Sequence, residues 1–153
     1  MPLLLREQNI HEIITKRLEI SPKPPKQRTE ASKGLISKWR KVARRSCNGK
    51  RKVSIAMIGK YVKLSDSYAS VIKALKHAAI AANVSLTIHP VEAEHLEHKT
   101  SGHSKQYHEA WAKLCASNGI LVPGGFGVRG VEGKVAACKY ARLEKKPLLG
   151  IER

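Results

Sequence analysis

The sequence has 153 residues, enough for one domain with a hydrophobic core and an appendage but too few for two full domains. Its 29 lysine and arginine residues outnumber 12 aspartate and glutamate residues, which gives a net charge of +17, and hydrophobic residues make up 42% of the chain. The composition excludes a disordered polymer, the hydropathy excludes a membrane span, and three cysteines are too few for a disulfide-stapled secreted scaffold. We therefore expect a cytoplasmic protein with no membrane partner.

The basic side chains gather in the first third of the chain. Residues 1–52 carry 15 basic and 4 acidic side chains, whereas residues 53–153 carry 14 and 8. Apolar residues at helical spacing predict one amphipathic helix from Ile10 to Leu18 and a second from Leu35 to Ala43. The proline-rich segment 21–26 predicts a stiff linker between them. We expect residues 1–52 to be a mostly helical, basic linker and residues 53–153 to be a separate domain.

From residue 53 onward, predicted strands and helices alternate. An apolar, β-branched run predicts a strand at 53–58, and three more strands are predicted at 85–91, 119–123 and 147–151. Helical spacing predicts three helices: one capped by Ser65 or Ser67 and running to about residue 79, one near 107–115, and one over 132–145. This alternation predicts an α/β fold with a doubly wound parallel sheet of about four strands. Ligands of such sheets bind beyond the carboxyl ends of the strands, here at Gly59–Tyr61, Pro123–Gly127 and Ile151–Arg153.

Several motifs resemble those of the CTP synthase family. The run from Pro123 to Lys134 reads PGGFGVRGVEGK and resembles the signature PGGFGxRGxEGK. The run from Gly59 to Leu75 is similar to the family's GKYxxLxDxYxSVxxAL block, and Tyr107–Trp111 and 145–151 resemble further blocks in the same order. Pro2–Leu5 is similar to the end of the synthetase domain. The resemblance implies the N-terminal part of a class I glutamine amidotransferase domain, preceded by the interdomain linker.

The resemblance also implies roles for single residues of the glycine-rich run. Gly125, flanked by Gly124 and Phe126, would bind glutamine and donate a backbone N–H to the oxyanion that forms on the attacked amide. Glycine suits this task because a Cβ would obstruct the approach of a ligand oxygen to the backbone. Three further residues would take part in the response to the activator GTP: Arg129, Gly130 and Glu132.

The nucleophile position departs from the family pattern. The fourth strand of the family ends in LGxCLGMQ, whose cysteine attacks glutamine, but this chain has Glu152 at that position. The remaining triad members lie further downstream in the family. We therefore expect no catalysis by this chain. We also expect it to be a fragment, a truncated gene product or a degenerate paralogue, and the sequence leaves these three alternatives open.

The complete family enzyme aminates UTP to CTP with Mg-ATP and glutamine-derived ammonia. For this chain we expect no cofactor. Its expected partners are glutamine, bound weakly if at all, and intact CTP synthase subunits.

Two other functions compete with this interpretation. The net charge and the runs Arg44–Arg45 and Lys50–Lys52 favour non-specific nucleic-acid binding, although no recognised nucleic-acid-binding motif accompanies them. A metal site is the second alternative, disfavoured because its candidates lack a recognised ligand spacing. Those candidates are His89, His95, His98, His103 and His108, with Glu92, Glu94 and Glu97.

Three further side chains are given non-catalytic interpretations. Lys60 follows a glycine, but the surrounding residues lack the spacing and the hydroxyl of a phosphate-binding loop. It is therefore expected to be a surface or interdomain cation. Cys115 and Cys138 fall in predicted helices and are expected to be inert, buried thiols.

Overall fold

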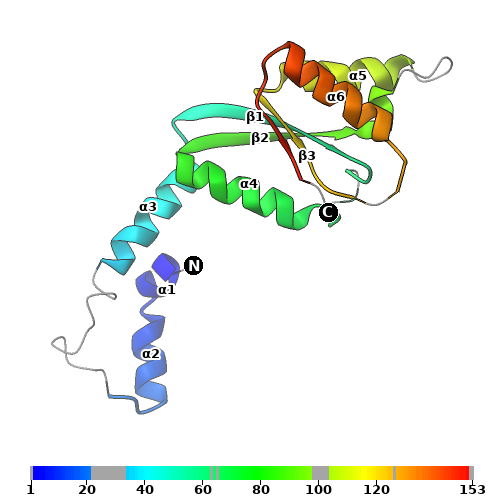
Figure 1. The fold of residues 1–153 in the computed structure, drawn as a ribbon. Coiled ribbons are helices and arrows are strands. Elements are labelled where there is room, and N and C mark those ends of the chain that lie inside the picture. Colours follow the sequence, from blue (N-terminus) through cyan, green and yellow to red (C-terminus); the bar gives the residue numbers. More distant parts are fainter. Residues whose placement is uncertain are drawn as a thin grey trace. The chain divides into compact units, whose positions relative to one another are not determined.

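The computed structural model describes residues 2–21, 34–62, 64, 66–97, 104–125 and 127–151. The chain divides into two compact units, Met1–Asn48 and Gly49–Arg153 (Figure 1). The boundary between the units falls inside the basic run that extends from Arg44 to Lys52. The predicted proline-rich linker lies outside the described residues, apart from its first position.

The first unit is helical. It contains α1 (Pro2–Glu7), α2 (Ile10–Arg17) and α3 (Leu35–Cys47), and no residue of these three helices is buried. Asn9 separates α1 from α2 because it adopts a left-handed backbone conformation, with φ of 51°. Both predicted amphipathic helices are therefore present, but their apolar faces are not covered within the described part of this unit.

The second unit contains a parallel sheet of four strands, as the alternating sequence pattern predicts. The strands are β1 (Arg51–Gly59), β2 (Val84–Glu92), β3 (Gly119–Val122) and β4 (Leu148–Gly150), in the spatial order β2-β1-β3-β4. Ile55 pairs with Ile88 of β2 and with Gly119 of β3, which makes β1 a central strand. Leu121 of β3 pairs in turn with Leu149 of β4.

The helices of the second unit lie on both faces of this sheet. Figure 1 shows α4 (Ala69–Ala82) on one face and α5 (Ser104–Ala116) with α6 (Val131–Leu143) on the other. The buried core lies on the α5 and α6 side, where Ile58, Val91 and Leu114 pack with Leu96 of the short 3-10 helix η3 (Ala93–Leu96). On α4 only Ala79 is buried. The sheet is therefore covered more completely on one face than on the other.

Two local predictions are wrong. Neither serine caps α4, since Tyr68 holds the cap position and Ser65 lies outside the described residues. The tyrosine takes this place because its hydroxyl reaches back to accept a hydrogen bond from the backbone N–H of Lys60, at 3.1 Å. The two helical cysteines are exposed rather than buried. Each follows a core-facing residue by one position, Leu114 on α5 and Ala137 on α6, so its side chain points about 100° away from the core.

Candidate functional site

The strand order predicts a ligand site at the carboxyl ends of β1 and β3. The chain leaves β1 for β2 on one side and later enters β3 on the other side of β1. At such a reversal the loops that follow the two central strands diverge, which opens the space where doubly wound sheets bind ligands. The loop after β3, residues 123–130, is called the glycine loop below, and Lys60 directly follows β1.

The first cavity lies where β3 and β4 end. It has a volume of about 440 Å³, within the range of small-molecule sites, about 300–1,000 Å³. Its lining comes from both strand ends and from one lysine of α6: Val122, Pro123, Gly124, Gly125, Gly150, Ile151 and Lys134. The fold therefore brings two of the three predicted glutamine-binding residues beside the segment that leads to the nucleophile position. Phe126 and Glu152 themselves lie outside the described residues.

The glycines of the loop serve different purposes. A Cβ built on Gly125 would meet no atom within 4 Å, so the space beside this residue is open. Gly127 has φ of +81°, a conformation that other residues rarely adopt. Gly130 also has a positive φ, of +71°, and its Cβ would lie 2.8 Å from the Cβ of Ala93. Packing therefore requires glycine at position 130, whereas the open space beside Gly125 leaves room for a ligand.

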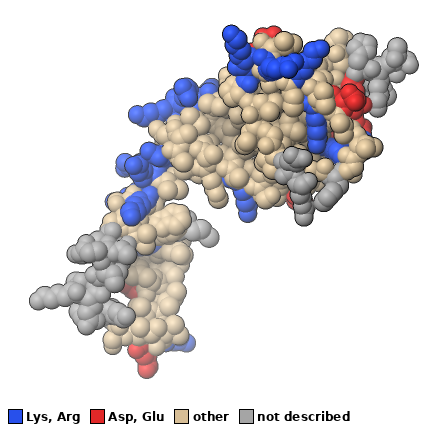
Figure 2. Space-filling view, in the orientation of Figure 1, with Lys and Arg blue, Asp and Glu red and all other residues tan. Residues whose placement is uncertain are grey.

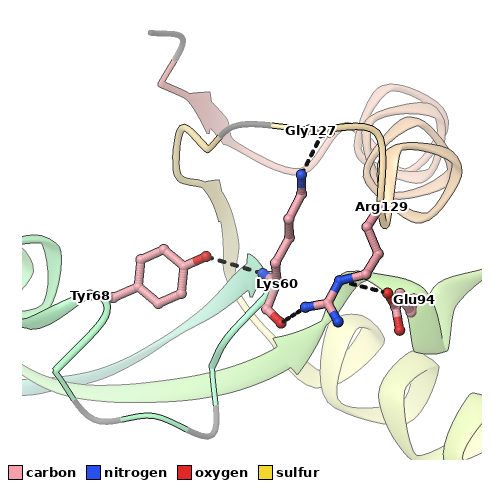
Figure 3. Close-up of polar contacts among 5 residues, drawn as sticks. All are labelled: Lys60, Tyr68, Glu94, Gly127 and Arg129. Carbon is pink, nitrogen blue, oxygen red and sulfur yellow. Dashed lines mark hydrogen bonds and ion pairs between the residues drawn. The ribbon is translucent and has the colours of Figure 1, made fainter.

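Lys60 ties the glycine loop to β1. It is a buried residue, 7% exposed, and its Nζ donates a hydrogen bond of 2.5 Å to the carbonyl oxygen of Gly127 (Figure 3). The predicted position at a strand end is confirmed and the predicted surface position is wrong, whereas an interdomain role stays a prediction. The lysine turns inward because the loop offers a backbone acceptor directly above the end of the strand. Gly59 allows this arrangement, since a Cβ there would lie 2.6 Å from the hydroxyl oxygen of Tyr68.

Arg129 makes a second connection between the same two segments. Its guanidinium donates a hydrogen bond of 3.0 Å to the carbonyl oxygen of Lys60 and forms an ion pair with Glu94, with 2.9 Å between Nε and Oε1 (Figure 3). It also stacks over the ring of Tyr61, 4.7 Å from the centroid. The ion pair is partly exposed, so it contributes about 0–1 kcal/mol, and its main effect is to orient the loop.

A second cavity, of about 420 Å³, lies on the other side of Arg129. It is lined by residues of the glycine loop, the start of α6 and η3 with its following residue: Val128, Arg129, Gly130, Val131, Glu132, Glu94 and Glu97. The three residues predicted to respond to GTP thus share one cavity. Sequence analysis offered no reason to place Glu94 and Glu97 beside them, because η3 and the residue after it carry no motif.

The electrostatics of the first cavity are set by Lys134. Burial lowers the pKa of this lysine, and the positive charge of Lys60 lowers it further. Two cationic side chains therefore approach the glycine loop, one from β1 and one from α6. Sequence reasoning placed Lys60 at the surface and gave Lys134 no role, although Lys134 lies within the signature run.

The proposed metal ligands do not form a site in the described part of the chain. No group of three histidine, cysteine, aspartate or glutamate side chains is arranged there to hold a metal ion. His98 and His103 lie outside the described residues. Across the described helices, none is both long enough and apolar enough to span a membrane.

Known proteins similar to this chain agree on one family. The family profile "Glutamine amidotransferase class-I" matches residues 63–151. CTP synthase of Drosophila melanogaster is 48% identical over 153 residues, which is 99% of this chain and 23% of that protein. Human CTP synthase 1 is 47% identical over 152 residues, 99% of this chain and 25% of that protein. The chain thus spans about a quarter of the length of these curated relatives.

A solved structure extends the agreement to the fold. The glutaminase domain of Trypanosoma brucei CTP synthase, with bound acivicin, shares 42% identity with this chain and superposes with a TM-score of 0.54. The match covers 64% of this chain and 35% of that one. The chain therefore belongs to the class I glutamine amidotransferase family, in which it is homologous to part of the CTP synthases.

Proposed function

We propose that this chain carries the glutamine-binding part of a CTP synthase glutaminase domain. The observation that supports the proposal most directly is the first cavity, in which Gly124 and Gly125 adjoin Gly150 and Ile151. A glutamine seated there would have its amide beside both the proposed oxyanion donors and the nucleophile position. Acivicin, bound to the similar domain from Trypanosoma brucei, is a glutamine analogue.

The glycine loop supplies the chemistry. A backbone N–H of Gly125 would donate to the amide oxygen as negative charge develops on it, and one such donor lowers the barrier by about 3–4 kcal/mol. The donor is effective only if the loop is held still. Lys60 and Arg129 provide that restraint, because they join the loop to the end of β1.

We further propose that this chain does not hydrolyse glutamine. Glu152 stands at the position of the nucleophilic cysteine, and a carboxylate would form a mixed anhydride rather than the thioester formed by an activated thiolate. No histidine lines the first cavity among the described residues. A thiol at position 152 would therefore find no base among the described residues of this lining.

The activity of the whole protein is part of the same proposal. A complete enzyme of this type would aminate UTP to CTP with Mg-ATP and glutamine-derived ammonia, and GTP would act through Arg129, Gly130 and Glu132. Arg129 is already engaged with Glu94 and with the carbonyl oxygen of Lys60. A bound nucleotide would therefore change the loop by replacing these contacts.

Two measurements on the full chain test the proposal. Titration with L-glutamine should shift the amide N–H signals of Gly124 and Gly125 in NMR spectra, whereas D-glutamine should leave them unchanged. Gly125→Ala should abolish the shift at Gly124 and keep the melting temperature, because the new Cβ meets no atom within 4 Å. Equal shifts with both enantiomers, or unaltered binding by Gly125→Ala, would refute the assignment of this cavity to glutamine.

Ammonia release tests the proposed inactivity separately. The chain and its Glu152→Cys variant should both release no more ammonia from glutamine than a buffer blank, with GTP present. Because the members of a catalytic triad act as a unit, one restored member recovers little of the rate. Turnover by Glu152→Cys within tenfold of an intact class I amidotransferase would show that the remaining machinery is present.

A further inference from the structure

Helix α3 has two chemically opposite faces. With about 3.6 residues per turn, its apolar side chains fall on one half of its circumference and its cations on the other. Leu35, Trp39 and Val42 lie along the apolar half at successive turns. The other half carries five cations: Lys38, Arg40, Lys41, Arg44 and Arg45. No acidic residue interrupts the helix, so the charge of this face is not neutralised within α3.

The apolar face is exposed within the first unit. Leu35, Trp39 and Val42 are 48%, 43% and 40% exposed, respectively. Helix α1 contacts α3 without burying any residue of it. Figure 2 shows lysine and arginine side chains gathered on the α3 segment beside uncharged surface. The helix therefore presents an apolar strip and a basic strip side by side.

A partner of α3 must match both its apolar strip and its basic strip, and this requirement distinguishes a lipid surface from a nucleic acid. A nucleic acid would neutralise the cations, and its bases can stack on Trp39, but it would leave Leu35 and Val42 in water because it offers no apolar layer. The surface of an anionic bilayer offers both, with headgroup charges above an acyl boundary about 5–10 Å deep. Tryptophan is favoured at that boundary, because its ring is apolar and its N–H is polar.

We propose that α3 binds the surface of an anionic lipid bilayer, lying in the plane of the headgroups. Leu35, Trp39 and Val42 enter the acyl boundary, and the cations contact the acidic headgroups. The expectation of no membrane partner rested on the lack of a spanning segment. An interfacial helix needs no such segment, since 13 residues suffice to lie on a surface although they are too few to cross one.

Vesicle flotation with the full chain tests the proposal. The probes are phosphatidylcholine vesicles with and without phosphatidylserine, at physiological ionic strength. The chain should float with the anionic vesicles only, and added salt should weaken the binding. In a Trp111→Phe background, emission from Trp39 should move to shorter wavelength on binding and be quenched by brominated lipid. Trp111 is suited to removal, because its buried indole nitrogen has no hydrogen-bond partner in the described part of the chain.

Matched variants separate the two faces. Removing three cations with Lys38→Gln, Lys41→Gln and Arg44→Gln should weaken binding to anionic vesicles roughly fivefold per cation, on the order of 100-fold in total. The control removes three exposed cations from α4 and α6 and should have little effect: Lys73→Gln, Lys76→Gln and Lys139→Gln. Circular dichroism of every variant verifies that its helix content is kept.

The apolar face decides between lipid and nucleic acid. Leu35→Ser with Val42→Ser keeps every charge, so it should weaken vesicle binding at least tenfold and leave binding to single-stranded RNA unchanged. Vesicle binding unaffected by this pair, an unmoved Trp39 emission, or equal loss with the control cations would each overturn the proposal. The first two outcomes, together with tight RNA binding, would assign α3 to nucleic acid instead.

Discussion

Replacing Lys60 with methionine removes the ammonium group that joins the end of β1 to the glycine loop and keeps an unbranched, apolar stem. A hydrogen bond from a charged donor contributes about 1.5–3 kcal/mol. Part of this lost free energy is offset. Lys60 is only 7% exposed, so burial of its ammonium costs free energy that a buried methionine does not cost. The backbone contacts of Lys60 with Tyr68 and Arg129 do not depend on the side chain. We expect a net loss of about 1–2 kcal/mol.

The melting temperature measures this loss. For a unit of this size, each kcal/mol lowers the melting temperature by about 4–8 °C, so the variant should unfold roughly 5–15 °C below the parent chain. A second readout comes from Lys134, whose pKa is lowered first by burial and then by the charge of Lys60. In Lys60→Met the pKa of Lys134 should rise and still remain below 10.5, because burial persists. NMR titration of the lysine side chain follows this change.

A control variant and a contradicting result can be stated for this prediction. Lys139→Met makes the same chemical change at an exposed position of α6, and it should alter neither the melting temperature nor the pKa of Lys134. If Lys60→Met unfolds at the temperature of the parent chain and leaves that pKa unchanged, then Lys60 does not hold the glycine loop, and the account of the site is wrong.

Three further predictions concern packing, pH and exposed surface. Gly133→Ala should destabilise the second unit by about 3 kcal/mol in denaturant unfolding, because its Cβ would lie 1.8 Å from a backbone oxygen of η3, whereas Gly150→Ala should be tolerated. A hydrogen bond with Cys115 and then burial raise the pKa of Tyr140 from 10.0 to about 12, so the free energy of unfolding should fall as pH rises from 10 toward 12, and Tyr140→Phe should remove this decline. The exposed apolar side chains of β4 should bind a hydrophobic dye, and Leu149→Ser should reduce the fluorescence.

The strands and helices of the second unit follow from the sequence because their signals are local. The apolar stretches of β1 and β3 are typical of strands buried in a parallel sheet. In β2 apolar residues alternate with Ser85, Thr87 and His89, which is the pattern of a strand buried on one face. The predicted strand at residue 53 begins two residues earlier in the structure, at Arg51. Those two positions are basic and exposed, so they extend the backbone pairing with β2 without contributing to the apolar run.

The inward position of Lys60 could not be predicted in this way. Lysine is almost always exposed, and its acceptor here is a backbone carbonyl 67 positions further along the chain. A carbonyl is present at every residue, so no residue type marks Gly127 as the partner. Only the pairing of β1 with β3, which brings the two segments to one edge of the sheet, makes the contact possible.

The glycines show how one motif can combine two physical requirements. Gly130 and Gly133 are needed because η3 packs against them so closely that neither has room for a Cβ. Gly125 has open space beside it, so packing alone does not require glycine there. The same run therefore fixes the start of α6 against η3 and leaves its preceding turn accessible from the first cavity. Under the proposed function, a glutamine in the first cavity would meet backbone N–H groups of a segment that Lys60 and Arg129 join to the end of β1, and an oxyanion donor requires such a fixed position.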